Sequence, residues 1–253
     1  MAGRVTSTSA TGPRLRLNIA YSSWDLIWSH VHRVLVINLG MTAANLPLLA
    51  ALQLHHQPWH RPLLFGPLLL LTGPSLAAAF AYLDQAGAGG PATVRAYVRA
   101  YTRLFRPALL VSAPHLLAAV AAVVDIVVLR ATPAGPALVP MAGVTAALAL
   151  LSCVVALAHV AAHGRVGRRV FVLAPFAVVR HGPLALMNLV LLTAGLLLVN
   201  QAPLLGLSVL PGCVVCVVWH NCRSLALLAD TAVRAGPVAG RSAEAVRVHS
   251  HVS

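Results

Sequence analysis

The sequence predicts an all-α integral membrane protein, a bundle of six transmembrane helices, and three observations lead to that prediction. First, 59% of the 253 residues are hydrophobic and only 9% are charged, whereas soluble domains carry about 25% charged residues. Second, six apolar runs are long enough to cross a bilayer core, which takes about 20 residues. Third, the number of arginines alternates from one connection to the next. Lipid is therefore expected to be the solvent for most of the chain.

The six predicted spans divide the chain into three regions. A cytoplasmic N-terminal tail with an interfacial segment covers 1–33, the transmembrane domain covers 34–222, and a cytoplasmic, partly disordered tail covers 223–253. The spans themselves are expected at about 34–54, 62–83, 108–129, 137–162, 183–200 and 203–222. The last two runs meet with almost no loop, so they form either a tight hairpin or one interrupted segment.

The arginine counts predict the orientation of the chain. The N-terminal tail, the five connections and the C-terminal tail contain 4, 1, 4, 1, 4, 0 and 4 arginines in that order. By the positive-inside rule, both termini and the second and fourth connections face the cytoplasm. The net charge of +13 would indicate nucleic-acid binding in a soluble protein. Here it reflects cytoplasmic arginines, so no nucleic-acid partner is expected.

Residues 93–106 predict an amphipathic interfacial helix on the cytoplasmic side. Thr93 is a suitable N-cap, and Pro107 is expected to end the helix. Arginines near anionic inner-leaflet lipids contribute about 1 kcal/mol each, and tyrosines favour the interface. The helix is predicted to contact lipid or a partner protein through six residues: Arg95, Arg99, Arg103, Arg106, Tyr97 and Tyr101.

Two segments carry a resemblance to a known family. Thr72–Leu83 reads TGPSLAAAFAYL, and after a short loop comes the basic helix with its apolar continuation, VRAYVRAYTRLFRPALLVS. This arrangement resembles the YesL-like family of bacterial multi-pass membrane proteins of unknown function, and the segments INLG and NLPLL in the first span also fit. The longer stretch LHHQPWHRPLLFGP departs from the family. The resemblance implies the bacterial cell membrane, an accessory role in solute transport, with carbohydrate uptake suggested, and a transporter permease or other membrane protein as partner.

Polar residues inside the predicted spans are the candidates for a solute or proton path. Asp125 is the only acidic residue within a span, and a carboxylate at mid-bilayer costs roughly 2.5–3.5 kcal/mol. Asp125 either handles a proton or cation or pairs with Arg130, about one turn further on. His115 and His159 either relay protons or form hydrogen bonds across a helix interface.

Other patterns favour structural roles. Gly40 with Ala44 and Gly73 with Ala77 have the spacing of closely packed membrane helices. His55, His56 and His60 have no cysteine or carboxylate nearby in the sequence to complete a metal site. Cys213, Cys216 and His220 lie inside an apolar span and the chain has no second such cysteine pair, so no metal is expected there either. The chain has no HExxH motif, nucleophile elbow, paired carboxylates or phosphate loop. No catalytic residue, cofactor or enzyme activity is therefore expected.

Two functions remain open from the sequence. The first is an accessory or scaffolding protein of a transport system, whose arginines engage lipid and a partner. The alternative is a small secondary carrier acting on its own, with Asp125, His115 and His159 near its solute path.

Overall fold

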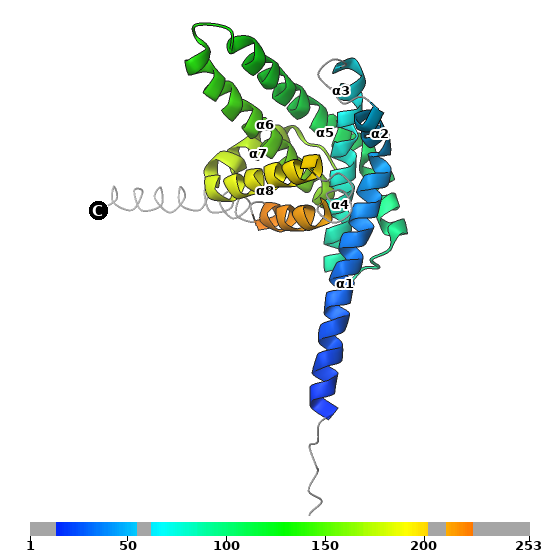
Figure 1. Ribbon diagram of the computed structural model, residues 1–253. Helices are drawn as coiled ribbons and strands as arrows, with labels where there is room; N and C mark the ends of the chain where they lie inside the picture. Colours follow the sequence, from blue (N-terminus) through cyan, green and yellow to red (C-terminus); the bar gives the residue numbers. More distant parts are fainter. Residues whose placement is uncertain (1–13, 55–61, 202–210, 225–253) are drawn as a thin grey trace, which may run out of the picture.

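The computed structural model describes residues 14–54, 62–201 and 211–224, and every regular element in these ranges is a helix (Figure 1). The all-helical prediction is therefore confirmed for this part of the chain. The helices are α1 (Arg14–Ala44), α2 (Leu46–Leu54), α3 (Pro62–Leu70), α4 (Thr72–Gly87), α5 (Val94–Leu129), α6 (Gly135–His163), α7 (Arg168–Arg180), α8 (Gly182–Gln201) and a further helix at 211–224.

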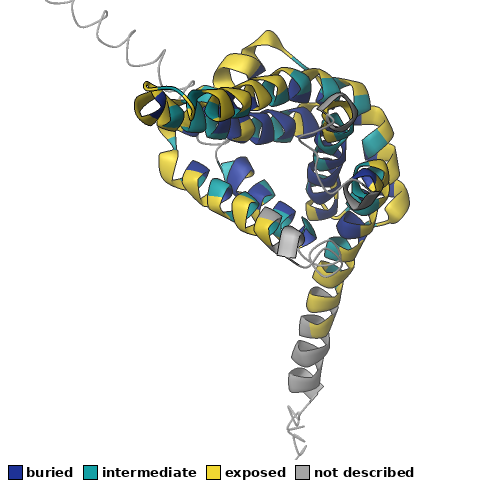
Figure 2. Ribbon diagram, turned by 45° about the horizontal axis from the view of Figure 1, so that its top comes forward, coloured by how far each residue is buried: buried dark blue, intermediate teal, exposed yellow. Residues whose placement is uncertain are grey.

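Helix α4 is the centre of the bundle. It packs against α1, α5 and α6, and most of its residues are buried. Its sequence is rich in alanine and contains one charged residue, so the helix has no broad polar face that would have to be exposed to water. Figure 2 shows the buried residues on the inner sides of the packed helices and exposed residues along their outer sides. The part of α1 that leads to the N-terminus projects away from this bundle (Figure 1).

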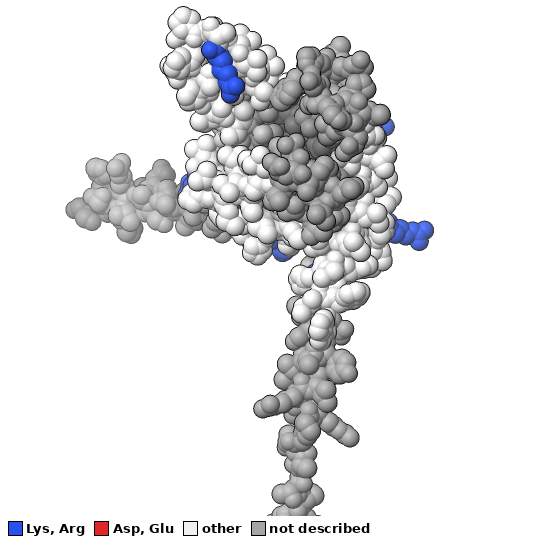
Figure 3. All heavy atoms as spheres, in the orientation of Figure 1, with Lys and Arg blue, Asp and Glu red and all other residues white. Residues whose placement is uncertain are grey.

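Helices α5 and α6 form a long hairpin whose outer half exposes apolar side chains. At about 1.5 Å per residue, the 36-residue α5 is longer than the roughly 30 Å hydrocarbon core of a bilayer. Large side chains near the hairpin tip are 47–69% exposed, among them Leu117, Val120, Val127, Met141 and Val144. On the face shown in Figure 3, the described surface is uncharged apart from a few isolated basic side chains. Such a surface is suited to lipid rather than to water.

Within the described residues, three helical segments are long and apolar enough to cross a membrane: Gly66–Gly87, Val94–Leu129 and Gly135–His163. A fourth is obtained if α7 and the part of α8 up to Gly195, which are bent by 97° relative to each other, are one broken span. These segments match the second to fifth predicted spans and indicate a multi-pass membrane protein. The first predicted span is divided at Asn45 into α1 and α2. Residues 203–210 of the sixth lie outside the described residues.

The prediction that the basic helix ends at Pro107 is wrong. Helix α5 continues through both Pro107 and Pro114 to Leu129. A proline inside a helix costs about 3 kcal/mol because it removes a hydrogen bond and crowds the preceding turn. On both sides of Pro107, however, one face of α5 stays buried, with Leu104 and Ala108 each 0% exposed. This packing against the neighbouring helices outweighs the local cost, so the basic segment is the first part of a long helix.

Tyr97 is also not on the surface, contrary to the prediction. Its side chain is 2% exposed, and its hydroxyl donates a hydrogen bond to the backbone carbonyl of Ser75 at 3.0 Å. The ring lies against Gly40, where an added Cβ would be 2.5 Å from a ring carbon. The close packing predicted at Gly40 is thus observed, and its partner is Tyr97. The Ser75 hydroxyl in turn accepts a hydrogen bond from Asn45 at 2.9 Å, so α4 is joined to α5 and to the end of α1.

Candidate ligand-binding cavity at one end of the bundle

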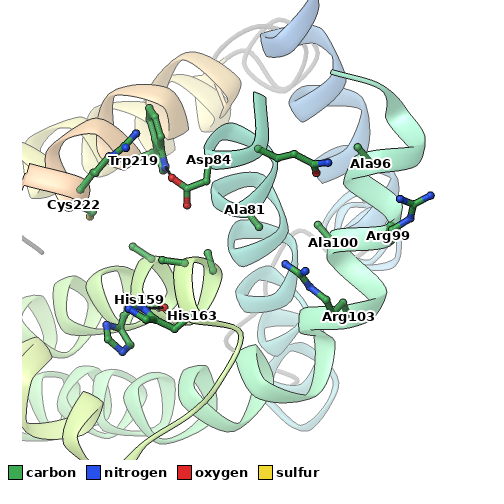
Figure 4. A pocket seen from close by; sticks show the side chains of 15 residues that line it. Ala81, Asp84, Ala96, Arg99, Ala100, Arg103, His159, His163, Trp219 and Cys222 are labelled. Atoms are coloured by element: carbon green, nitrogen blue, oxygen red, sulfur yellow. Dashed lines mark hydrogen bonds between the residues drawn. The ribbon is translucent and has the colours of Figure 1, made fainter. Parts of the chain in front are cut away.

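A cavity of about 680 Å³ lies where four helices come together at one end of the bundle. The end of α4, the start of α5, the end of α6 and residues 219–223 line it (Figure 4). On α4, on α5 and in 219–223 the lining residues follow the i, i+3, i+4 spacing of one helix face, and on α6 they are five of the last six residues. The lining residues are Ala81, Asp84, Gln85, Ala96, Arg99, Ala100, Arg103, Ala158, His159, Ala161, Ala162, His163, Trp219, Cys222 and Arg223.

Alanines create the space for this cavity. Six of them come from α4, α5 and α6, and their methyl groups are too short to fill the volume between the helix axes. The longer polar side chains stand around this apolar lining. The cavity therefore combines a small-residue wall with charged groups, as ligand sites commonly do.

Asp84 and Trp219 connect two of the helices that line the cavity. The indole Nε1–H of Trp219 donates a hydrogen bond to Oδ1 of Asp84 at 3.1 Å. The guanidinium of Arg223 lies 5.5 Å from the centre of the Trp219 ring, within the range of a cation–π interaction. Trp219 thus contacts a charged group on each of two sides, and its ring lies beside the guanidinium of Arg223.

The opposite walls bring further basic groups. Arg99 and Arg103 extend from α5, Arg103 toward the cavity and Arg99 away from it, and His159 and His163 lie on α6 (Figure 4). The two imidazole rings are stacked with centres 4.2 Å apart, and Nδ1 of His163 contacts the backbone carbonyl of His159 at 3.0 Å. Three arginines line this space with one aspartate, so the cavity carries an excess of positive charge.

The structure divides the predicted arginine surface in two. All four arginines are exposed, as predicted, but only Arg99 and Arg103 line the cavity. Arg95 and Arg106 lie on the same side of α5 outside it. Tyr101 is half-buried, and its ring contacts that of Phe105 edge to face at 5.6 Å.

The predicted solute or proton path is not assembled as one site. Of its three residues, only His159 lines the cavity. Asp125 is exposed on α5, in the half of the helix that leads to the hairpin tip. The ring of His115 stacks on Phe171 of α7 at 5.8 Å, and its Nδ1 contacts the carbonyl of Val111 at 2.8 Å. The packing of His115 therefore joins α5 to α7.

The cysteine groups form no metal site in the described part of the chain, where no three His, Cys, Asp or Glu residues come close enough to hold an ion. Cys213 and Cys216 are free thiols. His55, His56 and His60 lie outside the described residues.

Sequence reasoning missed Asp84, Trp219 and Arg223 as members of one site. Asp84 comes directly after the apolar run of the second predicted span, so the sequence places it in the following loop. A signal was present, because Ala81, Asp84 and Gln85 share one helix face with the spacing i, i+3, i+4. The buried pair Asn188 and Asn221 was missed as well; Nδ2 of Asn221 donates to Oδ1 of Asn188 at 2.8 Å, between α8 and the 211–224 helix.

The resemblance to the YesL-like family stays a prediction. In comparisons with known protein families, with curated proteins and with solved structures, nothing matches this chain.

Proposed function

We propose that this chain is an accessory or scaffolding component of a solute-transport system in the bacterial cell membrane, with both termini in the cytoplasm. The resemblance described above suggests carbohydrate as the solute class. In this proposal the exposed arginines of α5 hold a partner protein, such as a transporter permease, and also contact anionic lipid.

The observation that carries the proposal is the position of the four arginines on a helix that is anchored in the core. They lie on one exposed side of α5, while the other side is fixed in the core by Tyr97 and Leu104, which are 2% and 0% exposed. A row of charges on a rigid helix gives a partner a defined surface, because few side chains have to be ordered on binding.

The proposed orientation has support from the arrangement of the helix ends. The arginine counts assign the ends of α4 and α6 and the start of α5 to the cytoplasm. These ends meet around one cavity, together with the end of the 211–224 helix. A topology that placed them on opposite sides of the membrane would conflict with this arrangement.

The test is purification of the tagged protein from its native membrane in mild detergent, with mass spectrometry of the chains that accompany it. Arg95→Glu with Arg106→Glu reverses two charges of the proposed surface without changing the cavity lining. Arg130→Glu reverses an exposed charge just beyond the far end of α5 and serves as the control. A stoichiometric permease that is retained by the control and lost by the double variant supports the proposal. A solitary protein in all three preparations contradicts it.

The second candidate is a small carrier acting on its own. The observation that favours it is the cavity itself, because it lies between three candidate membrane spans. A carrier would take up solute in liposomes that contain no other protein, and this uptake would depend on cavity residues such as His159 rather than on Asp125.

A further inference from the structure

We propose that the cavity binds a phosphomonoester, a ligand that bears one terminal phosphate group. This site goes beyond the proposed accessory function and does not depend on it. The phosphate could belong to an anionic lipid headgroup or to a soluble metabolite, and the chemistry that recognises it is the same.

The charges that line the cavity are the first observation behind this site. Arg99, Arg103 and Arg223 line it from two helices, and the one carboxylate on the described wall, Asp84, already accepts a hydrogen bond from Trp219. The whole chain has only five acidic residues, so few carboxylates are available to neutralise these arginines. The excess of about two positive charges matches a phosphomonoester, which carries about −1.5 to −2 at neutral pH.

The backbone does not cancel this excess. Arginine and histidine at helix C-termini often serve to offset the helix dipole, which amounts to roughly half a charge at each end. Among the described helix ends, the C-terminal ends of α4 and α6 and the N-terminal end of α5 meet at this cavity. Together they contribute about half a negative charge, which leaves the cavity positive.

The geometry of the arginines suits a phosphate group. The guanidinium of Arg103 points toward the cavity, whereas that of Arg99, one turn earlier on α5, points away from it (Figure 4). Arg99 is exposed, so a change of its rotamer can bring both guanidinium groups to the same anion, each with two parallel N–H donors. Arg223 stands on a different helix, where its guanidinium lies 5.5 Å from the centre of the Trp219 ring. This cation–π contact favours a conformation of Arg223 beside the cavity, so less entropy is lost when the side chain binds an anion.

The size and the lining of the cavity describe the rest of the ligand. A volume of about 680 Å³ is far more than one phosphate needs and lies in the range of sites for small organic molecules, about 300–1,000 Å³. The remaining wall consists of alanine methyl groups with Trp219. The part of the ligand that is attached to the phosphate is therefore uncharged. On the described wall, Asp84 is the one carboxylate that could bind a cationic group of the ligand.

The test uses the full-length protein in nanodiscs of neutral phosphatidylcholine and two matched probes. Glycerol 3-phosphate is titrated by calorimetry as the soluble probe. Phosphatidic acid, which carries the same headgroup on acyl chains, is added as the lipid probe and followed by native mass spectrometry. Phosphatidylglycerol, a phosphodiester with a single charge, is the lipid control.

Two double variants separate the cavity from general surface charge. Arg103→Gln with Arg223→Gln removes two cavity charges, and Arg95→Gln with Arg106→Gln removes two charges outside it. Both variants lower the net charge by the same amount. We expect at least tenfold weaker binding for the cavity variant and less than a threefold change for the other. Binding of both probes identifies a soluble ligand class, and binding of phosphatidic acid alone identifies a lipid; either result supports the site.

A further variant covers the case in which the cavity variant fails to fold. Ala162→Leu keeps every charge, but places a larger side chain at an exposed position of the cavity wall. It should weaken binding because it occupies ligand space. The proposal is overturned if neither probe binds the wild type, if both double variants lose affinity equally, or if phosphatidylglycerol binds as well as phosphatidic acid.

Discussion

The indole of Trp219 donates a hydrogen bond to the carboxylate of Asp84 at 3.1 Å, although the two residues are 135 positions apart in the sequence. This contact joins the central helix α4 to the 211–224 helix beside the cavity. Trp219→Phe keeps an aromatic ring but removes the donor. We expect it to lower stability by about 1 kcal/mol, since a hydrogen bond to a half-exposed charged group is partly screened. Thermal unfolding in detergent, followed by fluorescence-detected size exclusion, measures the change.

The control for this prediction is Trp28→Phe, because Trp28 is 72% exposed on α1. It should leave the unfolding midpoint unchanged. Equal losses in the two variants would mean that the Asp84 contact adds no stability.

Gly212 is required by a close approach of two helices. Its backbone N–H donates to Oδ1 of Asn38 at 2.6 Å, and an added Cβ would lie 2.8 Å from that same oxygen and 2.8 Å from the carbonyl oxygen of Val34. Gly212→Ala should push the 211–224 helix away from α1 and destabilise the protein by about 1–3 kcal/mol. Gly143→Ala is the opposite case, since a Cβ added there would meet no atom within 4 Å. At that position the helix propensity of alanine should leave stability equal or raise it by up to about 1 kcal/mol.

Tyr97 should act through the core and not through lipid. Tyr97→Phe removes the side-chain hydrogen bond to the buried carbonyl of Ser75, which should cost about 1 kcal/mol of stability. Tyr101→Phe, at a half-buried position one turn further, should cost less. Binding to vesicles with anionic lipid distinguishes the two roles. A core role predicts that Tyr97→Phe lowers stability and leaves vesicle binding unchanged. The surface role that the sequence predicts for Tyr97 would instead require Tyr97→Phe to weaken vesicle binding.

Asn188 and Asn221 should be energetically coupled across their 2.8 Å hydrogen bond. Asn188→Leu or Asn221→Leu alone leaves the side-chain amide of the other residue buried without this hydrogen-bond partner. The double replacement removes both amides, so no amide of the pair stays buried without its partner. A double-mutant cycle of unfolding free energies should therefore give a coupling of about 0.6 kcal/mol and at most about 1.7 kcal/mol, the average and the maximum for hydrogen-bonded pairs inside a membrane protein. Additive effects would show that α8 and the 211–224 helix do not depend on this pair.

The proposed orientation can be checked with two single cysteines in a background without the four native ones. Ala131→Cys lies at the exposed tip of the α5–α6 hairpin, and Gly167→Cys lies at the exposed start of α7. Neither change alters the arginine counts that set the topology. In intact cells a membrane-impermeant maleimide should label the first and not the second. Labelling of Gly167→Cys from outside would reverse the orientation.

The sequence by itself determined the helical, apolar character of the chain and several helix limits. The predicted fourth span, 137–162, corresponds to α6, Gly135–His163. Its limits follow from local signals, because Pro136 sits in the first turn and Gly164 adopts a left-handed φ of 68° directly after the end. The third predicted span ends at Leu129, as α5 does. Such features depend on neighbours in the sequence, which is why they could be predicted.

Only the tertiary structure decided what covers each helix face and which polar residues meet. The spacing in 94–106 showed a basic side and an aromatic side, but not that α4 and α1 would enclose Tyr97 or that packing would carry the helix through Pro107. Asp84, Arg103 and Arg223 share a cavity because the ends of helices distant in sequence meet there. Periodicity along one helix gives the direction of a side chain, whereas its partner is fixed by the packing of all the helices together.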